Sequence, residues 1–248
     1  EKYDYEAGKS HQWDALAQPA GFGFNWSSNY TVYLETLEQF DFTDGSSGLV
    51  DRDMYDDNTP IDPSWDFEMI DPRMRASIFY PGSNFKDGKV FFHRSMTGNL
   101  EGWPRSGLSK LTGSMATGLL IRKRTNPETP DASRSSTDYI IFRFGEILLN
   151  YVEAAYYLGD PNGDLVSVMN QIRDRAGVPS LSLGEITEDK IRQERKCELA
   201  FEDHVFWDLR RWRIAVQELD NKRRHRLHYR FNANTETYTI EIADGDLG

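Results

Sequence analysis

Apolar side chains in the second half of the chain recur at the three- and four-residue intervals of a helical face. One stripe begins at Phe144, and Gly159 with Pro161 ends it. Another begins near Asp164 and stops at Gly177, and the short connection predicts an antiparallel helix pair. The apolar positions are Phe144, Ile147, Leu148, Tyr151, Val152 and Ala155 in the first helix, and Leu165, Val168, Met169 and Ile172 in the second.

Two further helices and a hairpin are predicted after this pair. A third helix begins near Thr187 and carries Ile191, Leu199 and Ala200, and a fourth covers about residues 205–219. In the segment that follows, apolar and polar residues alternate, and this alternation is typical of strands. A terminal β-hairpin is expected from the alternating residues on either side of the polar segment 232–237, which are Leu227, Tyr229, Phe231, Tyr238, Ile240 and Ile242.

The first half of the chain has weaker periodicity. Residues 1–28 are expected to be irregular, and a short helix capped by Asn29 is expected to end near Phe40. Its apolar face would consist of Tyr30, Tyr33, Leu34 and Leu37.

The acidic segment 41–71 is expected to be a loop that Pro60, Pro63 and Pro72 keep from becoming helical. Strand-like pieces follow at 77–80 and 90–93. The fold class expected is therefore mostly α. One domain, 1–248, would consist of a loop-rich region at 1–137 and a helical region with the hairpin at 138–248.

Charge and composition exclude several classes of protein. The 248 residues contain 29 Lys and Arg against 40 Asp and Glu, and the net charge of −11 makes a nucleic-acid partner unexpected. The single cysteine, Cys197, excludes an intrachain disulfide and a multi-cysteine metal site. No run of 18 apolar residues exists, so no membrane-spanning segment is expected.

Three carboxylates, Glu194, Glu198 and Glu202, recur every four residues along the third predicted helix. They would repel one another without cations. A di-iron site is disfavoured because His204 follows Glu202 by two residues, whereas that chemistry needs a spacing of three. We therefore expect ion pairs, with the nearby cations Arg192, Arg195, Arg210, Arg211 and Arg213 as partners.

No metal or cofactor site is predicted elsewhere. Asp51, Asp53 and Asp57 resemble the start of a calcium loop, but Tyr55 and Asp56 occupy positions that need a ligand and a glycine. The closing position holds Asp62, which is too short, so a solvated acidic loop is expected, with a loosely bound surface Ca²⁺ as the alternative. Nucleotide-binding and nucleophile motifs are absent, and no cofactor is expected.

Aromatic residues in polar, Gly- and Pro-rich surroundings are the candidate ligand contacts. An exposed ring packs against the C–H face of a sugar while neighbouring polar groups bind its hydroxyls. The alternative for each ring is that it anchors its own loop to the core. The residues proposed for the ligand are Trp26, Trp65 and Trp103, with Asp66 and Arg105 as hydroxyl partners.

Four blocks in the second half resemble signatures of the SusD/RagB family of nutrient-binding lipoproteins of Bacteroidetes. Two weaker resemblances lie at 36–45 and 71–78. The blocks are Arg143-Phe-Gly-Glu146-Ile-Leu-Leu-Asn-Tyr-Val-Glu153-Ala-Ala, Met169-Asn-Gln-Ile-Arg173-Asp-Arg175-Ala-Gly177, Glu194-Arg195-Lys-Cys-Glu198-Leu-Ala-Phe-Glu202 and Trp207-Asp208-Leu-Arg210-Arg211-Trp212.

This resemblance implies tetratricopeptide-like helix pairs and surface loops that bind an oligosaccharide or another nutrient without catalysis. It also implies delivery to a TonB-dependent transporter of the SusC type, and a cell-surface location at the outer membrane. Family members are about twice as long and carry an N-terminal lipid anchor. The chain is therefore expected to be a C-terminal portion without that anchor, since Cys197 lies within a predicted helix.

The family's signature positions coincide with the charged residues discussed above, and we expect them to form a structural ion-pair network that does not bind ligand. Its expected members are Arg143, Glu146, Glu194, Arg195, Glu198, Glu202, Asp208, Arg210 and Arg211.

Two other functions stay open at this point. A helical glycoside hydrolase would also carry loop tryptophans, but it needs a pair of carboxyl groups across a sugar, and the sequence singles out no such pair. A helical-repeat scaffold would bind only protein.

Overall fold

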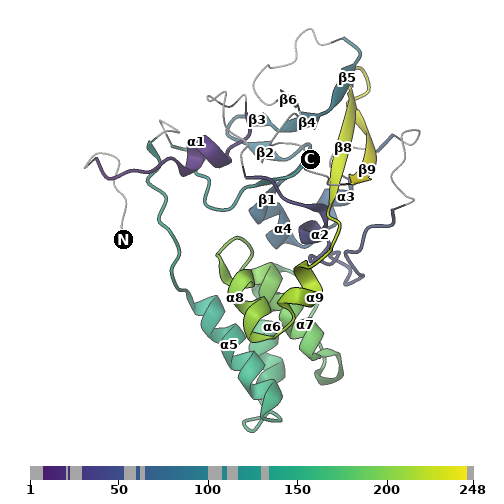
Figure 1. Ribbon diagram of the computed structural model, residues 1–248. Helices are drawn as coiled ribbons and strands as arrows, with labels where there is room; N and C mark the ends of the chain where they lie inside the picture. Colours follow the sequence, from purple (N-terminus) through teal and green to yellow (C-terminus); the bar gives the residue numbers. More distant parts are fainter. Residues whose placement is uncertain are drawn as a thin grey trace.

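The computed structural model describes residues 8–20, 22, 30–52, 60–61, 65–99, 108–110, 117–129 and 134–244, with the backbone alone for 65, 66, 108–110 and 244. Short strands and helices form one part of the molecule, and a group of helices forms the other (Figure 1). Among the described residues, no helix has the length and apolar character needed to cross a bilayer.

The helical part contains the longest helices. α5 (Phe144–Tyr157) and α6 (Leu165–Ala176) lie side by side, and Gly177 ends α6 in the left-handed conformation at φ 76°. α7 (Glu188–Glu198) begins at Thr187, whose side chain accepts a hydrogen bond from the backbone N–H of Lys190. α8 (His204–Arg211) and α9 (Ala215–Leu219) follow. The predicted helix pair is confirmed.

The other part is built from short elements. Its helices are α1 (Trp13–Ala17), α2 (Leu34–Leu37), α3 (Trp65–Glu68) and α4 (Pro72–Ser77). β1 (Ile78–Phe79) pairs with β7 (Leu120–Ile121), β2 (Asn84–Phe85) pairs with β3 (Gly88–Lys89), and β4 (Phe91–His93) runs parallel to β6 (Leu108–Lys110).

The predicted terminal hairpin is confirmed and belongs to a larger sheet. β8 (His225–Asn232) and β9 (Thr237–Asp244) are antiparallel, with Tyr229 opposite Ile240. β5 (Ser95–Thr97) adds a third, parallel strand along β8, with Ser95 opposite Arg230. The hairpin thereby packs against the first half of the chain.

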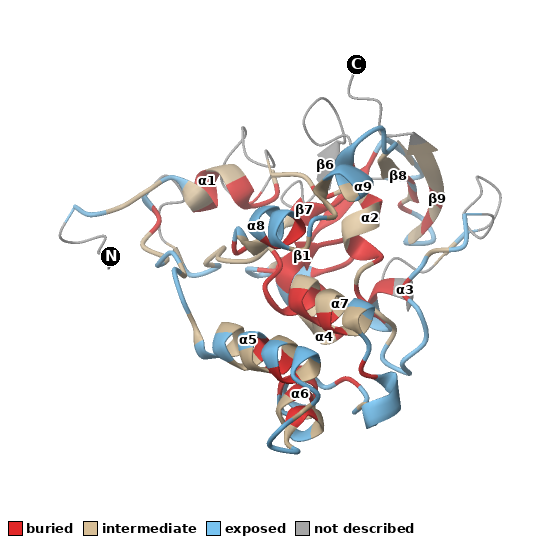
Figure 2. Cartoon of the chain, turned by 60° about the horizontal axis from the view of Figure 1, so that its bottom comes forward, coloured by how far each residue is buried: buried red, intermediate tan, exposed pale blue. Residues whose placement is uncertain are grey.

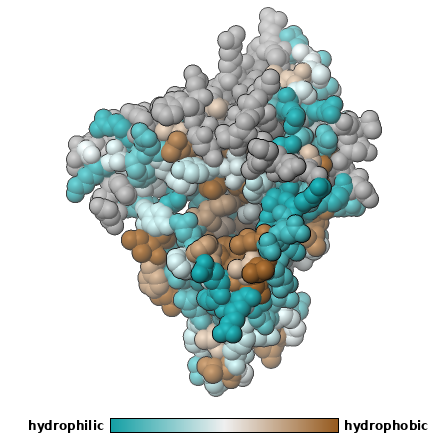
Figure 3. All heavy atoms as spheres, viewed as in Figure 1, coloured by the Kyte–Doolittle hydropathy of each residue, from teal (hydrophilic) through white to brown (hydrophobic). Residues whose placement is uncertain are grey.

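The hydrophobic core lies mainly in the part with the strands (Figure 2). Tyr229, Tyr238 and Phe231 of the hairpin pack there with Phe79, Phe91 and Phe92. A smaller cluster, which includes Val152, Leu165 and Met169, joins α5 to α6. Several large apolar residues of the helical part are exposed, and Figure 3 shows apolar side chains gathered on the face that carries α5 and α8.

Four sequence predictions differ from the structure. Only Leu34–Leu37 is helical in the segment predicted to start at Tyr30, because residues 30–32 are extended and hydrogen-bond to residues 119–121. Segment 41–71 includes α3, and Pro72 begins α4. The remaining two differences concern helix length: α7 ends at Glu198, and the predicted fourth helix is divided into α8 and α9.

Candidate functional site

An aromatic cavity lies where α1 meets later segments of the chain. Its volume is about 310 Å³. His11 and Thr137 of its wall are hydrogen-bonded to each other although they are 126 residues apart in the sequence, so the cavity exists only in the folded chain. The residues that line this aromatic cavity are His11, Gln12, Trp13, Leu16, Tyr30, Arg124, Thr137 and Tyr139.

Three rings and one guanidinium group form a platform in the cavity. Trp13 stacks on Tyr30, with 4.8 Å between ring centroids and 18° between ring planes. The guanidinium of Arg124 lies 3.9 Å from the Trp13 centroid and 4.7 Å from the Tyr139 centroid. Trp13 and Tyr30 are half-buried and Tyr139 is 42% exposed. Tyr30 and the guanidinium of Arg124 both lie against the faces of Trp13, so the surface left for a ligand is that of ring edges and of the partly exposed Tyr139, beside hydrogen-bond donors.

Hydrogen bonds fix the orientation of Trp13. Its indole N–H donates to the carbonyl of Lys123 at 3.2 Å, and its backbone N–H donates to Nδ1 of His11 at 3.1 Å. The other ring nitrogen of His11 lies 2.8 Å from the carbonyl of Thr137. Because a carbonyl only accepts, Nε2 of His11 carries the proton in this contact, and Nδ1 is the acceptor for Trp13. The ring of Trp13 is thus held before any ligand arrives.

Two buried polar atoms in the cavity wall have no hydrogen-bond partner among the described residues. They are Nε of Arg124 and Oγ1 of Thr137. An unpaired buried polar group costs about 1–3 kcal/mol, so it calls for an explanation. Arg124 also has a φ of 67°, which is uncommon for a residue other than glycine and is typical of functional sites. Both atoms are shielded from solvent, so a ligand would reach them only after the cavity wall shifts.

A second cavity, of about 450 Å³, lies between α2, α8 and α9. Much of its wall is apolar, from Val205, Phe206, Leu209 and Leu219. Among the described residues that line it, no buried side-chain nitrogen or oxygen lacks a partner. The aromatic cavity is therefore the better candidate for a polar ligand.

The three glutamates predicted to need cations form the carboxylate cluster, Glu194, Glu198 and Glu202. Glu194 accepts hydrogen bonds from Arg173 at 2.6 Å and from Arg73. Glu198 accepts from Arg143 and from Arg175, each at 2.6 Å.

The third glutamate, Glu202, accepts from Nε of Arg143 at 2.7 Å and from Lys123. The partners of the carboxylate cluster thus come from α4, α6 and the segments before α5. Of these partners, Arg143 was expected in the network, whereas Arg195, Arg210 and Arg211, the other expected arginines, make their contacts elsewhere.

Those arginines form a separate set of contacts around α8. Arg195 donates to Asp208 and to Asn150, each at 2.7 Å. Arg211 donates to Asp208 at 2.7 Å and to both carboxylate oxygens of Glu153, at 2.5 and 2.6 Å. The remaining predicted members are placed differently: Arg210 lies over the ring of Phe206, and Glu146 is 3.7 Å from His204.

The surrounding charges keep Glu198 and Glu202 ionised. Burial raises the pKa of the Glu198 carboxyl, but the hydrogen bond and charge of Arg143 and the charges of Arg175 and Arg73 outweigh burial, so the pKa lies below its ordinary value. The pKa of Glu202 is lowered in the same way, against the effect of burial, by Arg143 and Lys123. Both side chains are therefore anionic at neutral pH.

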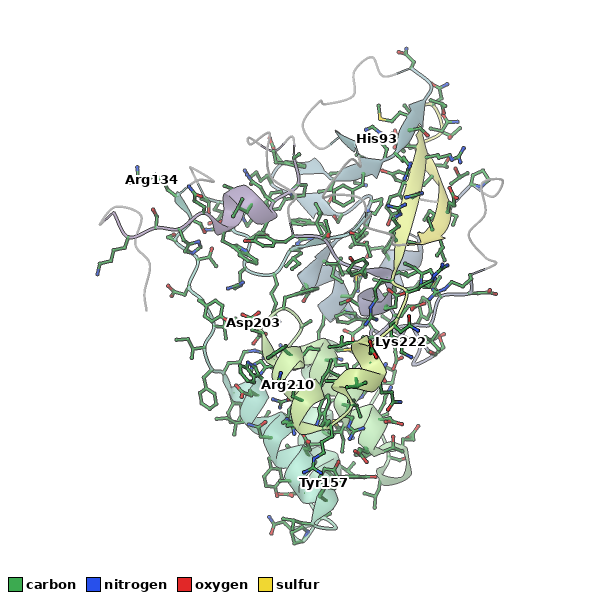
Figure 4. All side chains as sticks on the ribbon, in the orientation of Figure 1. His93, Arg134, Tyr157, Asp203, Arg210 and Lys222 are labelled. Carbon is green, nitrogen blue, oxygen red and sulfur yellow. The ribbon has the colours of Figure 1, made fainter. Side chains whose placement is uncertain are left out.

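The carboxylate cluster and the aromatic cavity are connected. Lys123 binds Glu202 through its ammonium group, while its carbonyl accepts the hydrogen bond from the indole of Trp13. The hydroxyl of Tyr139 donates to Asp203, the residue after Glu202. Figure 4 shows Asp203 at the top of the helical part, on the side of the segment that leads to α5. The ion pairs thus hold two sides of the cavity.

The residues proposed from the sequence as ligand contacts lie outside the part of the chain whose side chains the structure describes. Trp26, Trp103 and Arg105 lie outside the described residues, as do most of the acidic positions 51–62 considered for calcium. Trp65 and Asp66 belong to α3, but their side chains also lie outside the described part. In the described part of the chain, no group of three or more His, Cys, Asp or Glu residues is arranged to hold a metal ion.

Sequence reasoning missed Trp13, Tyr30, Arg124 and Tyr139. Trp13 was placed in an irregular segment, and Tyr30 was assigned to a helix face. No local pattern marks these residues as a site, because the contacts between them join segments far apart in the sequence. The only available signal was the general excess of aromatic residues, at 13% of the chain.

Comparisons with known proteins agree on one family. The SusD family model matches residues 2–245. Two curated SusD-like proteins of Formosa agariphila share 34% identity over 96 residues and 36% identity over 91 residues with this chain. These alignments cover 34% and 33% of this chain, and 19% and 18% of the relatives.

Solved structures share the fold. A SusD-like protein from Bacteroides fragilis superposes with a TM-score of 0.67 at 24% identity, over 97% of this chain and 47% of that protein. A SusD-like carbohydrate-binding protein from the same species superposes with a TM-score of 0.70 at 22% identity, over 91% of this chain and 43% of that protein. This chain therefore spans less than half the length of either solved relative.

Proposed function

Because this chain belongs to the SusD family, we propose that it binds an oligosaccharide in the aromatic cavity and does not transform it. The observation that carries this proposal is the cavity of about 310 Å³ whose wall combines Trp13, Tyr30 and Tyr139 with the guanidinium of Arg124. A sugar ring has an apolar C–H face and a rim of hydroxyl groups. The cavity has aromatic rings that can contact the C–H face and polar side chains that can bind the hydroxyl groups.

The chemistry of the wall supports binding over hydrolysis. The C–H face of a sugar would pack on ring surface, and its hydroxyls would hydrogen-bond to polar side chains of the wall such as Gln12 and Arg124. A glycoside hydrolase needs two carboxyl groups flanking the bond that it cleaves. The described residues that line the aromatic cavity include no carboxylate.

Calorimetric titration with a panel of oligosaccharides, followed by Trp13→Ala, tests this proposal. We expect the substitution to weaken binding of the best ligand roughly tenfold, because it removes the ring that holds Tyr30 and the guanidinium of Arg124 in place in the cavity wall. Trp207→Ala is the matched control, since Trp207 is 66% exposed on α8 and does not line the aromatic cavity. Equal affinity of the two variants would show that the sugar binds elsewhere. Release of reducing ends from the ligand would instead favour an enzyme.

The loop tryptophans remain a second part of the proposal. We propose that Trp26, Trp65 and Trp103, with Asp66 and Arg105, extend the contact with a longer oligosaccharide. The same titration with each Trp→Ala variant would show weaker binding of long ligands only. If all three variants bind every ligand like the wild type, these loops do not contribute.

Family membership also supports a proposal about the wider setting. We propose that α5 and α6 form a tetratricopeptide-like pair, and that the protein is held at the cell surface and passes its ligand to a SusC-type TonB-dependent transporter. Purification of the transporter together with the tagged protein would test the partnership. Recovery of the protein without a transporter from detergent-solubilised outer membranes would contradict it.

A further inference from the structure

Three consecutive cations, Arg122, Lys123 and Arg124, follow β7 along the chain. The first lies over the ring of Phe79, with 5.3 Å between the guanidinium carbon and the ring centroid. The second forms an ion pair with Glu202. Arg124 lines the aromatic cavity and forms no ion pair with any residue that the structure describes. Its positive charge is therefore open to a ligand.

The accessible donors of Arg124 are its terminal nitrogens. Nε is enclosed by the wall, whereas Nη1 and Nη2 are neither enclosed nor hydrogen-bonded to any described residue. The contacts with the rings of Trp13 and Tyr139 are cation–π contacts, which engage the ring faces and do not use the N–H groups. The two terminal nitrogens form a planar fork that can donate two parallel hydrogen bonds to the oxygens of one anionic group.

The rest of the described wall does not neutralise this charge. It contains no carboxylate, and Arg124 is its only described residue with a permanent charge. Asp203 accepts a hydrogen bond from the hydroxyl of Tyr139 and forms no ion pair with Arg124. The whole chain has a net charge of −11, so its long-range field repels anions. A preference for an anionic ligand would therefore have to arise inside the cavity.

We propose that the aromatic cavity selects oligosaccharides that carry an anionic group, and that Arg124 confers this preference. The inference rests on the proposed function, because it names the class of sugar that the same cavity binds. The anionic group accepts hydrogen bonds from the terminal nitrogens of Arg124, while the partly exposed ring of Tyr139 contacts the sugar beside it. The group is the carboxylate of a uronic acid or the sulfate ester of a sulfated sugar.

Matched pairs of oligosaccharides test the preference directly by calorimetric titration. Oligogalacturonides and oligomannuronates are each compared with their carboxyl-reduced forms, and carrageenan oligosaccharides are compared with their desulfated forms. The two members of a pair differ only in the anionic group. We expect the protein to bind the anionic member of at least one pair roughly tenfold more tightly than the neutral member. The pairs that show this difference identify the carboxylate or the sulfate ester as the group bound.

Substitution of Arg124 tests whether this residue is the source of the preference. Arg124→Gln should lower the affinity for the anionic member to that for the neutral member, and should change the affinity for the neutral member little. Arg124→Lys keeps the charge without the planar fork, so it should keep only part of the preference. Lys9→Gln is the control, because Lys9 is exposed two residues before His11 and does not line the cavity. It should keep the full preference.

Three results would overturn the inference, and each differs from a failure of the proposed function. Equal affinity for both members of every pair, with binding still weakened by Trp13→Ala, would leave the proposed function intact. An equal loss of both affinities in Arg124→Gln would show that Arg124 only holds the rings in place. If Arg124→Gln fails to fold, an unchanged preference in Arg124→Lys would overturn the inference, because that variant lacks the fork. If no oligosaccharide binds at all, the proposed function fails and this inference fails with it.

Discussion

At the scale of single residues, the sequence reveals that charges must be paired but not which partners pair them. Glutamates at four-residue intervals repel one another, so the need for cations follows from the spacing. The partners are Arg73, Lys123, Arg143, Arg173 and Arg175, which the fold gathers from segments separated by up to 125 residues. The aromatic cavity was hidden for the same reason. Neither set of contacts is local.

The first prediction concerns Glu198, which is only 2% exposed. Glu198→Ala should lower the free energy of unfolding by about 3 kcal/mol. The substitution removes a carboxylate partner from two guanidinium groups, that of Arg143 and the nearly buried one of Arg73. Urea denaturation measures this change. Ligand affinity of the folded protein should not change.

Glu128→Ala serves as the control, since Glu128 is exposed in a loop and should affect neither property. The expectation for Glu198 would be wrong if its alanine variant kept the stability of the wild type and lost affinity. That result would assign the carboxylate cluster to the ligand.

At the scale of elements, the long helices follow from the sequence because their ends carry ordinary signals. Gly177 in the left-handed conformation and Thr187 as an N-cap are examples. The break between α8 and α9 has no such signal: Arg213 adopts a φ of 60° without being glycine. Asp71 and Pro72 did give a signal that was misinterpreted. Asp71 accepts a hydrogen bond from the backbone of Arg73, and Pro72 occupies the first turn, so the pair starts a helix.

The second prediction concerns Gly145 near the start of α5. Helix propensity alone would favour alanine by about 1 kcal/mol. A methyl group there would lie 2.5 Å from Nη1 of Arg143 and 3.1 Å from Oε1 of Glu198, so it would push this ion pair apart. We therefore expect Gly145→Ala to lower stability by about 1 kcal/mol despite the better propensity.

A double-mutant cycle separates the two effects. In the Glu198→Ala background the ion pair is already lost, and Gly145→Ala should become neutral or stabilising. If the substitution has the same effect in both backgrounds, the ion pair does not explain the glycine.

At the scale of the whole molecule, the carboxylate cluster joins two hydrophobic cores. α7 carries Glu194 and Glu198, while Arg73 comes from α4 in the part with the strands and Arg173 from the helical part. Lys123 and Arg143 precede α5. The junction therefore depends on ionised carboxylates, which makes the stability of the protein depend on pH.

The third prediction follows from the lowered pKa values of Glu198 and Glu202, both below the ordinary value of 4.5. The unfolded chain binds protons on these groups before the folded chain does. Their contribution to stability is therefore complete well above pH 4.5 and is lost as the pH falls from there through the folded pKa values. The free energy of unfolding, measured by urea denaturation, should decrease over that range.

Glu198→Gln should be less stable than the wild type at neutral pH and should lose less stability as the pH falls, because one of the protonating groups is gone. Glu128→Gln should keep the slope of the wild type. A slope that is the same in Glu198→Gln and the wild type would show that acid sensitivity arises elsewhere.

The pairing of β5 with β8 also bears on how the protein is made. Ser95 meets Arg230, so the sheet cannot form until the ribosome has released a segment 135 residues further along the chain. Until then, the apolar residues of the main core have no hairpin to cover them. Such distant pairing makes folding slow and leaves the nascent chain prone to aggregation. A premature stop before His225 should thus yield insoluble protein, even though the aromatic cavity and all helices of the described residues precede that residue.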